Sequence, residues 1–161
     1  MKKYFYIMLV LALLGCDSEN APDCIQTAGD LVQIPYELPV FTKIRMEQNT
    51  SLVIKQGAMQ EVTLETGNNL LSDIKLYVED GVLVMRDNND CNYVRDFGLT
   101  KIYVTTPNIT EIRNGSSYGV VGEGVLNFPE LTLISNTTGG FDEFRKSGDF
   151  TLSIHTQNFR V

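Results

Sequence analysis

The sequence predicts an all-β protein whose C-terminal part forms a parallel β-solenoid, a fold in which successive coils of β-strand stack on one another. Apolar and polar residues alternate with a period of two from residue 32 onward, and the alternating segments are rich in β-branched and aromatic residues. No segment shows the apolar stripe of a sustained helix. After Pro107, apolar residues recur every 21 positions, at 112, 133 and 154, as expected of stacked coils.

The N-terminus has the pattern of a secretory signal. Two lysines precede an apolar run over residues 4–14, which is shorter than the ~20 residues that span a bilayer. Leu13-Leu14-Gly15-Cys16 resembles the lipobox of bacterial lipoproteins. The resemblance implies cleavage after residue 15 and lipidation of Cys16. An ordinary signal peptide with a chance cysteine and an uncleaved anchor are the alternatives.

Lipidation would make a membrane the first partner of this protein, held through Cys16. Each buried methylene of an acyl chain contributes ~0.8 kcal/mol, so several chains together hold a protein firmly. The expected location is the cell envelope, at the outer membrane. The sequence leaves the periplasmic and the surface face open.

Cleavage would leave one domain of ordinary size with a strongly acidic balance. The remaining 146 residues carry 20 acidic and 11 basic side chains, because two of the 13 basic residues lie in the signal, and their formal charge is −9. This balance argues against nucleic acid, anionic lipid and lipopolysaccharide as direct ligands. It favours cations or neutral glycans.

Residues 16–31 are polar and predict a tether, with Cys24 in its middle. Because an exported compartment is oxidising, Cys24 and Cys91 predict a disulfide that ties the second half of the tether to the domain. Closing a loop of this length stabilises a fold by roughly 4 kcal/mol. Two buried free thiols or a metal-binding pair are the alternatives, although two cysteines and one distant histidine do not make a zinc site.

The strands expected before Pro107 follow one another at short intervals. Asp80-Gly81 lies between two alternating runs and predicts a tight type I′ hairpin, since that turn needs positive φ at both central residues. Residues 70–74 form at most one helical turn. The expected strands are residues 41–46, 52–55, 62–66, 74–78, 82–85 and 101–105.

The segment after Pro107 carries the repeat on which the solenoid prediction depends. Asn114, Ser135 and Thr156 each follow a repeated apolar position by two residues. An antiparallel meander with similar strand spacing is the alternative, but tight hairpin turns are missing from this part of the sequence. The chain ends at Val161 inside an expected strand with no cap, so we expect the solenoid to be truncated at its C-terminal end.

Several segments in a fixed order carry a family resemblance. They are Phe41-Thr42-Lys43-Ile44, residues 52–57, 78–84 and 102–109, and Ile112-Arg113-Asn114-Gly115-Ser116. In this order they resemble the bacterial family described as putative auto-transporter adhesin, head GIN domain. The resemblance implies an exported protein or lipoprotein of Bacteroidota type, with a right-handed parallel β-solenoid over residues 32–161. No catalytic motif of the family carries over, and family domains continue beyond the point where this chain stops.

Few residues suggest metal or acid–base chemistry, and no cofactor is expected. Asp87-Asn88-Asn89-Asp90 gathers oxygen ligands of the kind calcium prefers, which makes Asp87 and Asp90 weak metal candidates. The glycine and distal glutamate of an EF-hand are missing, so a turn is the simpler interpretation. His155 is the only histidine and is expected on the solvent face of a strand.

Other side chains suggest contact with carbohydrate. Tyr93, Tyr103 and Tyr118 could stack on sugars, although burial in a β core is the commoner fate of such rings. A polysaccharide lyase or hydrolase would need acidic and basic groups that converge on one face. Asp142, Glu143, Arg145, Lys146 and Asp149 are close in sequence but are expected in a solvated loop.

The sequence therefore predicts a non-enzymatic binding or structural domain that is anchored in the cell envelope and serves adhesion or glycan contact. The anchor, the β domain and the lack of an assembled catalytic set support this prediction. A polysaccharide lyase or hydrolase built on a solenoid is one alternative. A periplasmic sensor or assembly factor that binds another envelope protein is the other.

Overall fold

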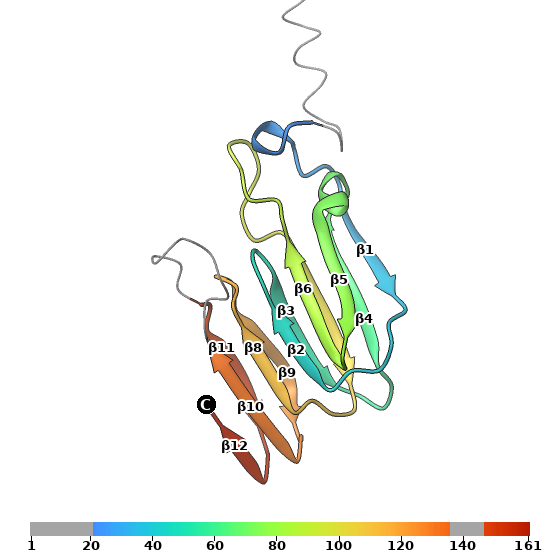
Figure 1. The fold of residues 1–161 in the computed structure, drawn as a ribbon, viewed down its shortest axis with the longest axis vertical. Helices are drawn as coiled ribbons and strands as arrows, with labels where there is room; N and C mark the ends of the chain where they lie inside the picture. Colours follow the sequence, from blue (N-terminus) through green and yellow to red (C-terminus); the bar gives the residue numbers. More distant parts are fainter. Residues whose placement is uncertain (1–20, 136–146) are drawn as a thin grey trace, which may run out of the picture.

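The computed structural model describes residues 21–135 and 147–161, which form two six-stranded β-sheets packed face to face (Figure 1). In spatial order, sheet A comprises β1 (Leu31–Tyr36), β4 (Glu61–Gly67), β7 (Lys101–Thr106), β3 (Ser51–Gln56), β9 (Val120–Leu126) and β11 (Phe150–Ile154). Sheet B comprises β12 (Asn158–Arg160), β10 (Glu130–Ser135), β8 (Glu111–Asn114), β2 (Lys43–Met46), β6 (Val82–Asp87) and β5 (Ile74–Glu79). Two short 3-10 helices, η1 (Asp23–Ile25) and η2 (Asn68–Asp73), lie at one end of the sheets.

The prediction of an all-β protein is confirmed, but the prediction of a right-handed parallel β-solenoid is wrong. Both sheets are mixed, because β1–β4 and β4–β7 pair antiparallel in sheet A and β5–β6 pair antiparallel in sheet B. The strands do not close into a solenoid. Alternation with a period of two is the same in parallel and antiparallel strands, so the pattern revealed the strands but not the direction of their partners.

Of the three apolar residues spaced 21 positions apart, only two lie opposite each other in paired strands. Ile112 in β8 lies opposite Leu133 in β10, and this pair of strands is parallel. Ile154 instead lies opposite Leu126 in sheet A, where β11 runs parallel to β9. The antiparallel meander is also wrong for the described strands after Pro107, because β8–β10, β10–β12 and β9–β11 are all parallel pairs.

The prediction of a tight hairpin at Asp80-Gly81 is confirmed. Asp80 and Gly81 have φ of 50° and 74°, and they join β5 to β6 with Glu79 opposite Val82. The helical turn expected over residues 70–74 overlaps η2, which is six residues long and begins two residues earlier, at Asn68. Strand β1 contains Pro35, which has no N–H. Among the described strands, β1 pairs with β4 alone and so lies at a sheet edge, where a proline is tolerated.

The core consists of the side chains at every second position of the strands, which face inward between the two sheets. Ile112 is fully buried, as are most of its neighbours in both sheets. Apolar burial of this kind is the main force that holds two sheets together. The core includes Ile44, Met46, Leu83, Met85 and Leu131 from sheet B and Leu52, Ile54, Leu64, Ile102 and Val120 from sheet A.

The inward rows end in polar residues at the end of the sandwich that carries η1. We refer to Thr66, Asp87, Thr100 and Asn114 as the polar cap; all four are buried. The Thr100 hydroxyl donates to Asp87 Oδ2 at 2.5 Å and lies 2.9 Å from the Thr66 hydroxyl, so this chain of bonds links sheet B to sheet A. The Asn114 amide donates to two backbone carbonyls, of Tyr118 and Gly148. The polar cap therefore closes the core where the loop of residues 88–100 crosses it.

Candidate functional site

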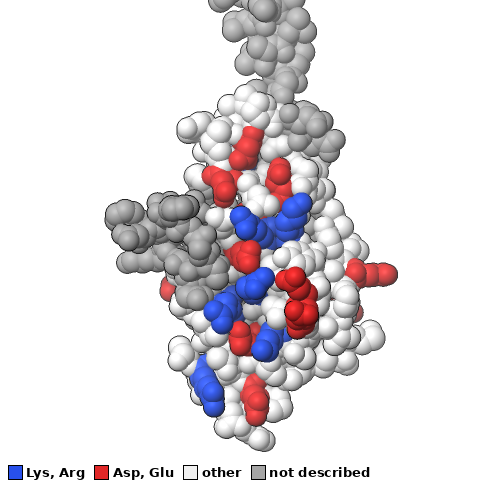
Figure 2. Space-filling model, in the orientation of Figure 1, with Lys and Arg blue, Asp and Glu red and all other residues white. Residues whose placement is uncertain are grey.

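The outward side of sheet B concentrates the positive charge of the described chain. Six of the nine described lysines and arginines lie there, together with four glutamates, although the whole chain has a formal charge of −7. Figure 2 shows the two signs interleaved along this side. We refer to it as the charged face, which comprises Lys43, Arg45, Lys75, Arg86, Arg113 and Arg160 with Glu47, Glu79, Glu111 and Glu130.

Two carboxylates of the charged face are each shared by two cations. Glu47 lies 3.0 Å from Arg45 Nε and 3.7 Å from Arg86 Nη1. Glu111 lies 3.7 Å from Arg113 Nη2 and 4.0 Å from Lys43 Nζ. Separations of 3.7–4.0 Å exceed a normal hydrogen bond, so these cations keep donor groups for a ligand. The centre of the face thus carries more positive than negative charge.

A shallow hollow of about 480 Å³ crosses the charged face at the end away from η1. Strand register places Lys43 beside Glu111, Glu111 beside Thr132, and Thr132 beside Arg160. These four side chains form one row across β2, β8, β10 and β12. Neighbouring strands lie ~4.8 Å apart, so the row is roughly 14 Å long with a cation at each end. An extended ligand laid across the strands would meet a new polar side chain at every strand.

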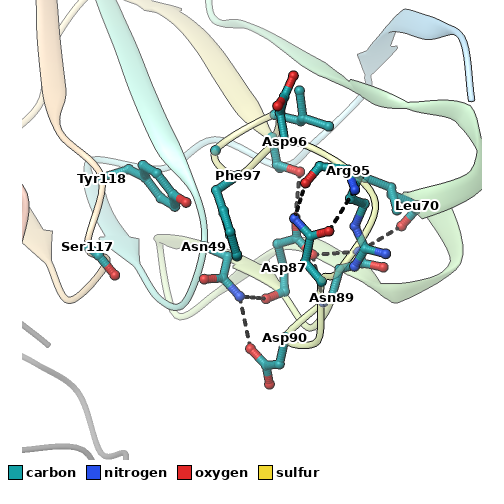
Figure 3. A pocket seen from close by; sticks show the side chains of 14 residues that line it. Asn49, Leu70, Asp87, Asn89, Asp90, Arg95, Asp96, Phe97, Ser117 and Tyr118 are labelled. Atoms are coloured by element: carbon teal, nitrogen blue, oxygen red, sulfur yellow. Dashed lines mark hydrogen bonds between the residues drawn. The ribbon is translucent and has the colours of Figure 1, made fainter. Parts of the chain in front are cut away.

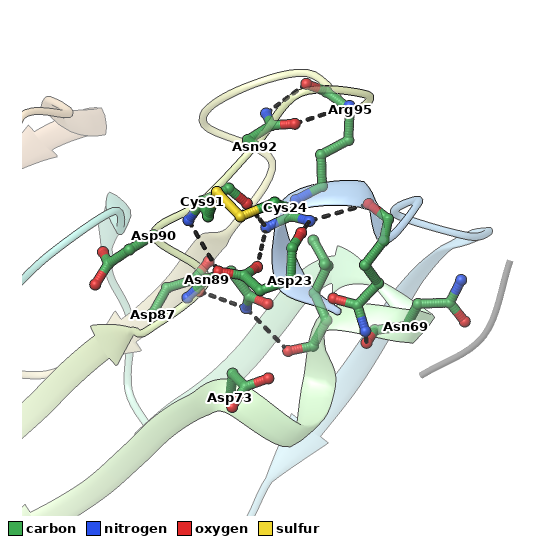
Figure 4. Close-up of polar contacts among 12 residues, drawn as sticks. Asp23, Cys24, Asn69, Asp73, Asp87, Asn89, Asp90, Cys91, Asn92 and Arg95 are labelled. Carbon is green, nitrogen blue, oxygen red and sulfur yellow. Dashed lines mark hydrogen bonds and ion pairs between the residues drawn. A yellow bond between two sulfur atoms is a disulfide. The ribbon is translucent and has the colours of Figure 1, made fainter. Parts of the chain in front are cut away.

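The structure joins Cys24 and Cys91 by a disulfide, with Cα atoms 4.5 Å apart (Figure 4). We refer to residues 88–100 as the disulfide loop. The Arg95 side chain is only 4% exposed and pairs with Asp23 at 2.6 Å. Asp23 also accepts the Cys91 N–H at 2.8 Å. The disulfide and this ion pair together fasten the disulfide loop to η1, and sequence reasoning did not identify the Asp23–Arg95 pair.

The two weak metal candidates have hydrogen-bonding roles. Buried Asp87 accepts bonds from Thr100 and from both nitrogens of Asn89, while exposed Asp90 accepts a bond from Asn49 at 2.9 Å (Figure 3). Within residues 21–135 and 147–161, no three His, Cys, Asp or Glu side chains converge as metal ligands would. The adjoining cavity of about 190 Å³ is lined in part by these same side chains.

A second polar cluster lies on the outward side of sheet A, around Glu65. Gln33 donates to its carboxylate at 2.6 Å, the Tyr103 hydroxyl at 3.3 Å, and Lys101 Nζ lies 3.4 Å away. The hydrogen bond from Gln33, with a smaller contribution from Lys101, lowers the pKa of Glu65 despite its burial. Burial and the neighbouring Glu65 carboxylate raise the pKa of Tyr103. Tyr103 therefore belongs to a structural network across β1, β4 and β7.

Residues 40–161 match the model of the family described as putative auto-transporter adhesin, head GIN domain. The chain belongs to this family. The resemblance drawn from the sequence is thus confirmed, and it covers all described strands except β1. The family description is that of an adhesin and names no catalytic activity.

Solved structures share the fold of this GIN domain at low sequence identity. A putative adhesin from Bacteroides fragilis has a TM-score of 0.60 at 17% identity, over 83% of this chain and 56% of that one. A putative adhesin from Parabacteroides merdae has a TM-score of 0.55 at 14% identity, over 65% of this chain and 43% of that one. A putative lipid binding protein from Parabacteroides distasonis has a TM-score of 0.53 at 12% identity, over 65% of this chain and 46% of that one. The GIN-domain chain spans about half the length of these proteins, and no curated protein matches its sequence.

Among the described residues of the GIN domain, the remaining candidates do not gather into one site. His155 and Asp149 are exposed at opposite ends of β11, and Tyr93 is 81% exposed on the disulfide loop. In the part that the structure describes, no helix is long and apolar enough to cross a membrane. Cys16, Asp142, Glu143, Arg145 and Lys146 lie outside the described residues.

We expect Glu65→Gln to remove a pH-dependent part of the stability of the GIN domain. The lowered pKa means that this part is complete above the ordinary glutamate value of ~4.3 and is lost as the pH falls through the folded-state pKa. Urea unfolding at about pH 7 and at about pH 3 should therefore show a gap between wild type and variant that narrows in acid. Glu61→Gln, at an exposed position of the same strand, is the control. A gap that is equal at both pH values would contradict the assignment.

Proposed function

We propose that this GIN domain is a non-enzymatic binding module of the cell envelope, anchored through a lipid on Cys16, and that its charged face binds an extended acidic glycan. The family membership and the lipobox support envelope display. The clustering of six described cations on one face of an acidic chain is the observation that carries the choice of ligand.

The pattern of charge favours a polymer with spaced carboxylates. The row from Lys43 to Arg160 has a cation at each end and, between them, two groups that hydrogen-bond to hydroxyls. Its step from strand to strand, ~4.8 Å, is comparable to the length of one sugar in an extended glycan. A densely charged polymer such as nucleic acid would be repelled by the rest of the molecule, because the whole chain is acidic, with a formal charge of −7.

The same face is poorly suited to glycoside hydrolysis. That reaction needs one carboxyl group that is held protonated and a second one across the scissile bond. Glu47 and Glu111 are partly exposed, with side chains 21% and 26% exposed, and each is engaged by two cations that favour its ionised form. Their arrangement suits charge recognition better than proton transfer.

A binding measurement with a matched pair of variants tests the proposed ligand. We expect the mature protein to bind polygalacturonate but not dextran, with an affinity that falls as salt rises. Lys43→Glu should weaken binding about tenfold, because it reverses one charge in the row. Lys55→Glu makes the same charge change on an exposed strand position of sheet A and should have little effect.

The outcomes separate the candidate functions. Equal losses for the two variants would show unspecific attraction and contradict a site on the charged face. Absence of binding to every acidic glycan would overturn the proposed ligand. Shortening of the polymer during incubation would show an enzyme.

The anchor has its own test. We expect the full-length protein to sediment with membranes after a high-salt wash, because acyl chains on Cys16 bind independently of charge. Cys16→Ser should move it to the soluble fraction. Retention of the variant on membranes would contradict lipidation as the means of attachment.

A further inference from the structure

The end of the domain that carries the disulfide loop presents large apolar side chains to solvent. Tyr93, Val94 and Phe97 are 81%, 55% and 73% exposed, and Ile25 of η1 is 41% exposed. The Tyr93 N–H donates to the Cys24 carbonyl at 3.0 Å, which places the disulfide loop against η1. Figure 1 shows both at the same end of the sheets. We refer to Ile25, Tyr93, Val94 and Phe97 as the apolar tip.

Within the disulfide loop, the Asn92 and Arg95 side chains are turned inward, whereas those of Tyr93, Val94 and Phe97 are turned outward. The charged Arg95 is 4% exposed and bonds to Asp23, to two backbone carbonyls of residues 23 and 26, and to the Cys91 carbonyl. Asn92 accepts the backbone N–H of Val94 and of Arg95. These bonds hold the loop in one conformation, and that conformation keeps its aromatic rings exposed. Exposed apolar patches on a rigid support mark surfaces that meet a partner.

The length of chain before Ala21 indicates the partner. Only four residues, 17–20, separate Cys16 from Ala21, and an extended chain spans at most ~3.6 Å per residue. A lipid on Cys16 would therefore hold Ala21 within roughly 18 Å of the bilayer surface. Ala21 begins the described chain two residues before η1, at the end that bears the apolar tip.

We propose that the apolar tip inserts into the interfacial layer of the same membrane that holds Cys16. This inference rests on the anchor proposed above. Tyr93 has an aromatic ring with one polar edge, and such rings favour the boundary between headgroups and acyl chains. Insertion at this end directs β12 and the hollow of the charged face away from the membrane, because they lie at the opposite end of the sheets.

The charges near the tip specify the kind of lipid surface. Asp30, Asp90 and Asp96 are exposed near the tip, while the nearby cation Arg95 is already paired. Anionic headgroups would be repelled by these carboxylates. We therefore expect the tip to insert into zwitterionic phosphatidylethanolamine–phosphatidylcholine vesicles and less deeply into vesicles rich in phosphatidylglycerol.

The absence of tryptophan from the sequence allows a direct test. Phe97→Trp places one fluorescent reporter in the apolar tip, and Tyr77→Trp places one on the charged face at a position that is 44% exposed. Each full-length, lipidated variant is reconstituted into zwitterionic vesicles that contain brominated acyl chains. We expect F97W emission to shift to shorter wavelength and to be quenched several-fold more strongly than Y77W emission. Equal, water-like emission from both reporters would overturn the inference.

A second measurement keeps this inference separate from the anchor. Tyr93→Ser with Val94→Ser in the F97W background should abolish the quenching, while the protein stays on the vesicles through Cys16. An unchanged urea midpoint would show that the variant still folds. Quenching that persists in this variant would contradict insertion by the tip. If Cys16→Ser leaves membrane attachment unchanged, the lipid anchor is wrong, and this inference is wrong with it. If Cys16→Ser abolishes attachment but the F97W reporter is not quenched in the anchored protein, only the insertion of the apolar tip is overturned.

Discussion

Reduction of the Cys24–Cys91 disulfide is expected to lower the free energy of unfolding by about 4 kcal/mol, the entropy of closing a loop between cysteines 67 residues apart. The loss should be measurable by urea unfolding with and without a phosphine reductant. The Cys16→Ser background removes the third thiol. Reduction should also loosen the disulfide loop, because the hydrogen bonds and the ion pair of Arg95 would then hold it to η1 without a covalent link.

Thiol titration provides the control for this result. The denatured, non-reduced Cys16→Ser protein should show no reactive thiol, since both remaining cysteines are in the disulfide. A Cys24→Ala, Cys91→Ala variant should have the stability of the reduced protein and should not respond to the reductant. Two reactive thiols before reduction would rule out the disulfide in solution.

Asp87→Ala is expected to destabilise the domain by about 3 kcal/mol, because it removes the acceptor for a buried hydroxyl and two amide donors. The Thr100 hydroxyl would lose the bond that links the two sheets in the polar cap. Urea unfolding at neutral pH measures the change. We also expect faster amide hydrogen exchange in the disulfide loop, since Asn89 would lose its support.

Asp90→Ala is the matched control for this prediction. Asp90 lies three residues away, is exposed, and accepts a bond from one side chain, Asn49. Its removal should cost well under 1 kcal/mol. Similar losses for the two variants would contradict a special role of Asp87. A large gain in wild-type stability on adding calcium would point instead to a metal at this loop.

The strands of this domain could be read from the sequence, but their arrangement could not. Alternation located β2 to β7 because burial of one face imposes a period of two on any half-buried strand. The dipeptide Asp80-Gly81 fixed one antiparallel pair, since its positive φ values determine the geometry of the turn. Parallel pairs such as β3–β9 join residues about 70 positions apart, and no local signal specifies such a partner.

The candidate binding site escaped sequence reasoning for a related reason. The row from Lys43 to Arg160 draws one residue from each of four strands, so it is contiguous only in space. Net charge pointed away from acidic ligands because it sums over the molecule, whereas recognition depends on the local distribution. The cysteine pair could be predicted because a disulfide is the natural state of two cysteines in an oxidising compartment. No such signal pointed to the Asp23–Arg95 ion pair, whose residues are 72 positions apart.

Pro35 bears on how many copies of this protein could share one membrane. Anchoring would confine the molecules to two dimensions and raise the frequency of their collisions, and an open sheet edge is a template for pairing between neighbours. Among the described strands, β1 is such an edge, and Pro35 has no N–H to offer an incoming strand. Glu37 adds an exposed negative charge just beyond it, which repels an identical edge. This side of the domain is therefore protected against edge-to-edge aggregation, which favours dispersed molecules even at high surface density.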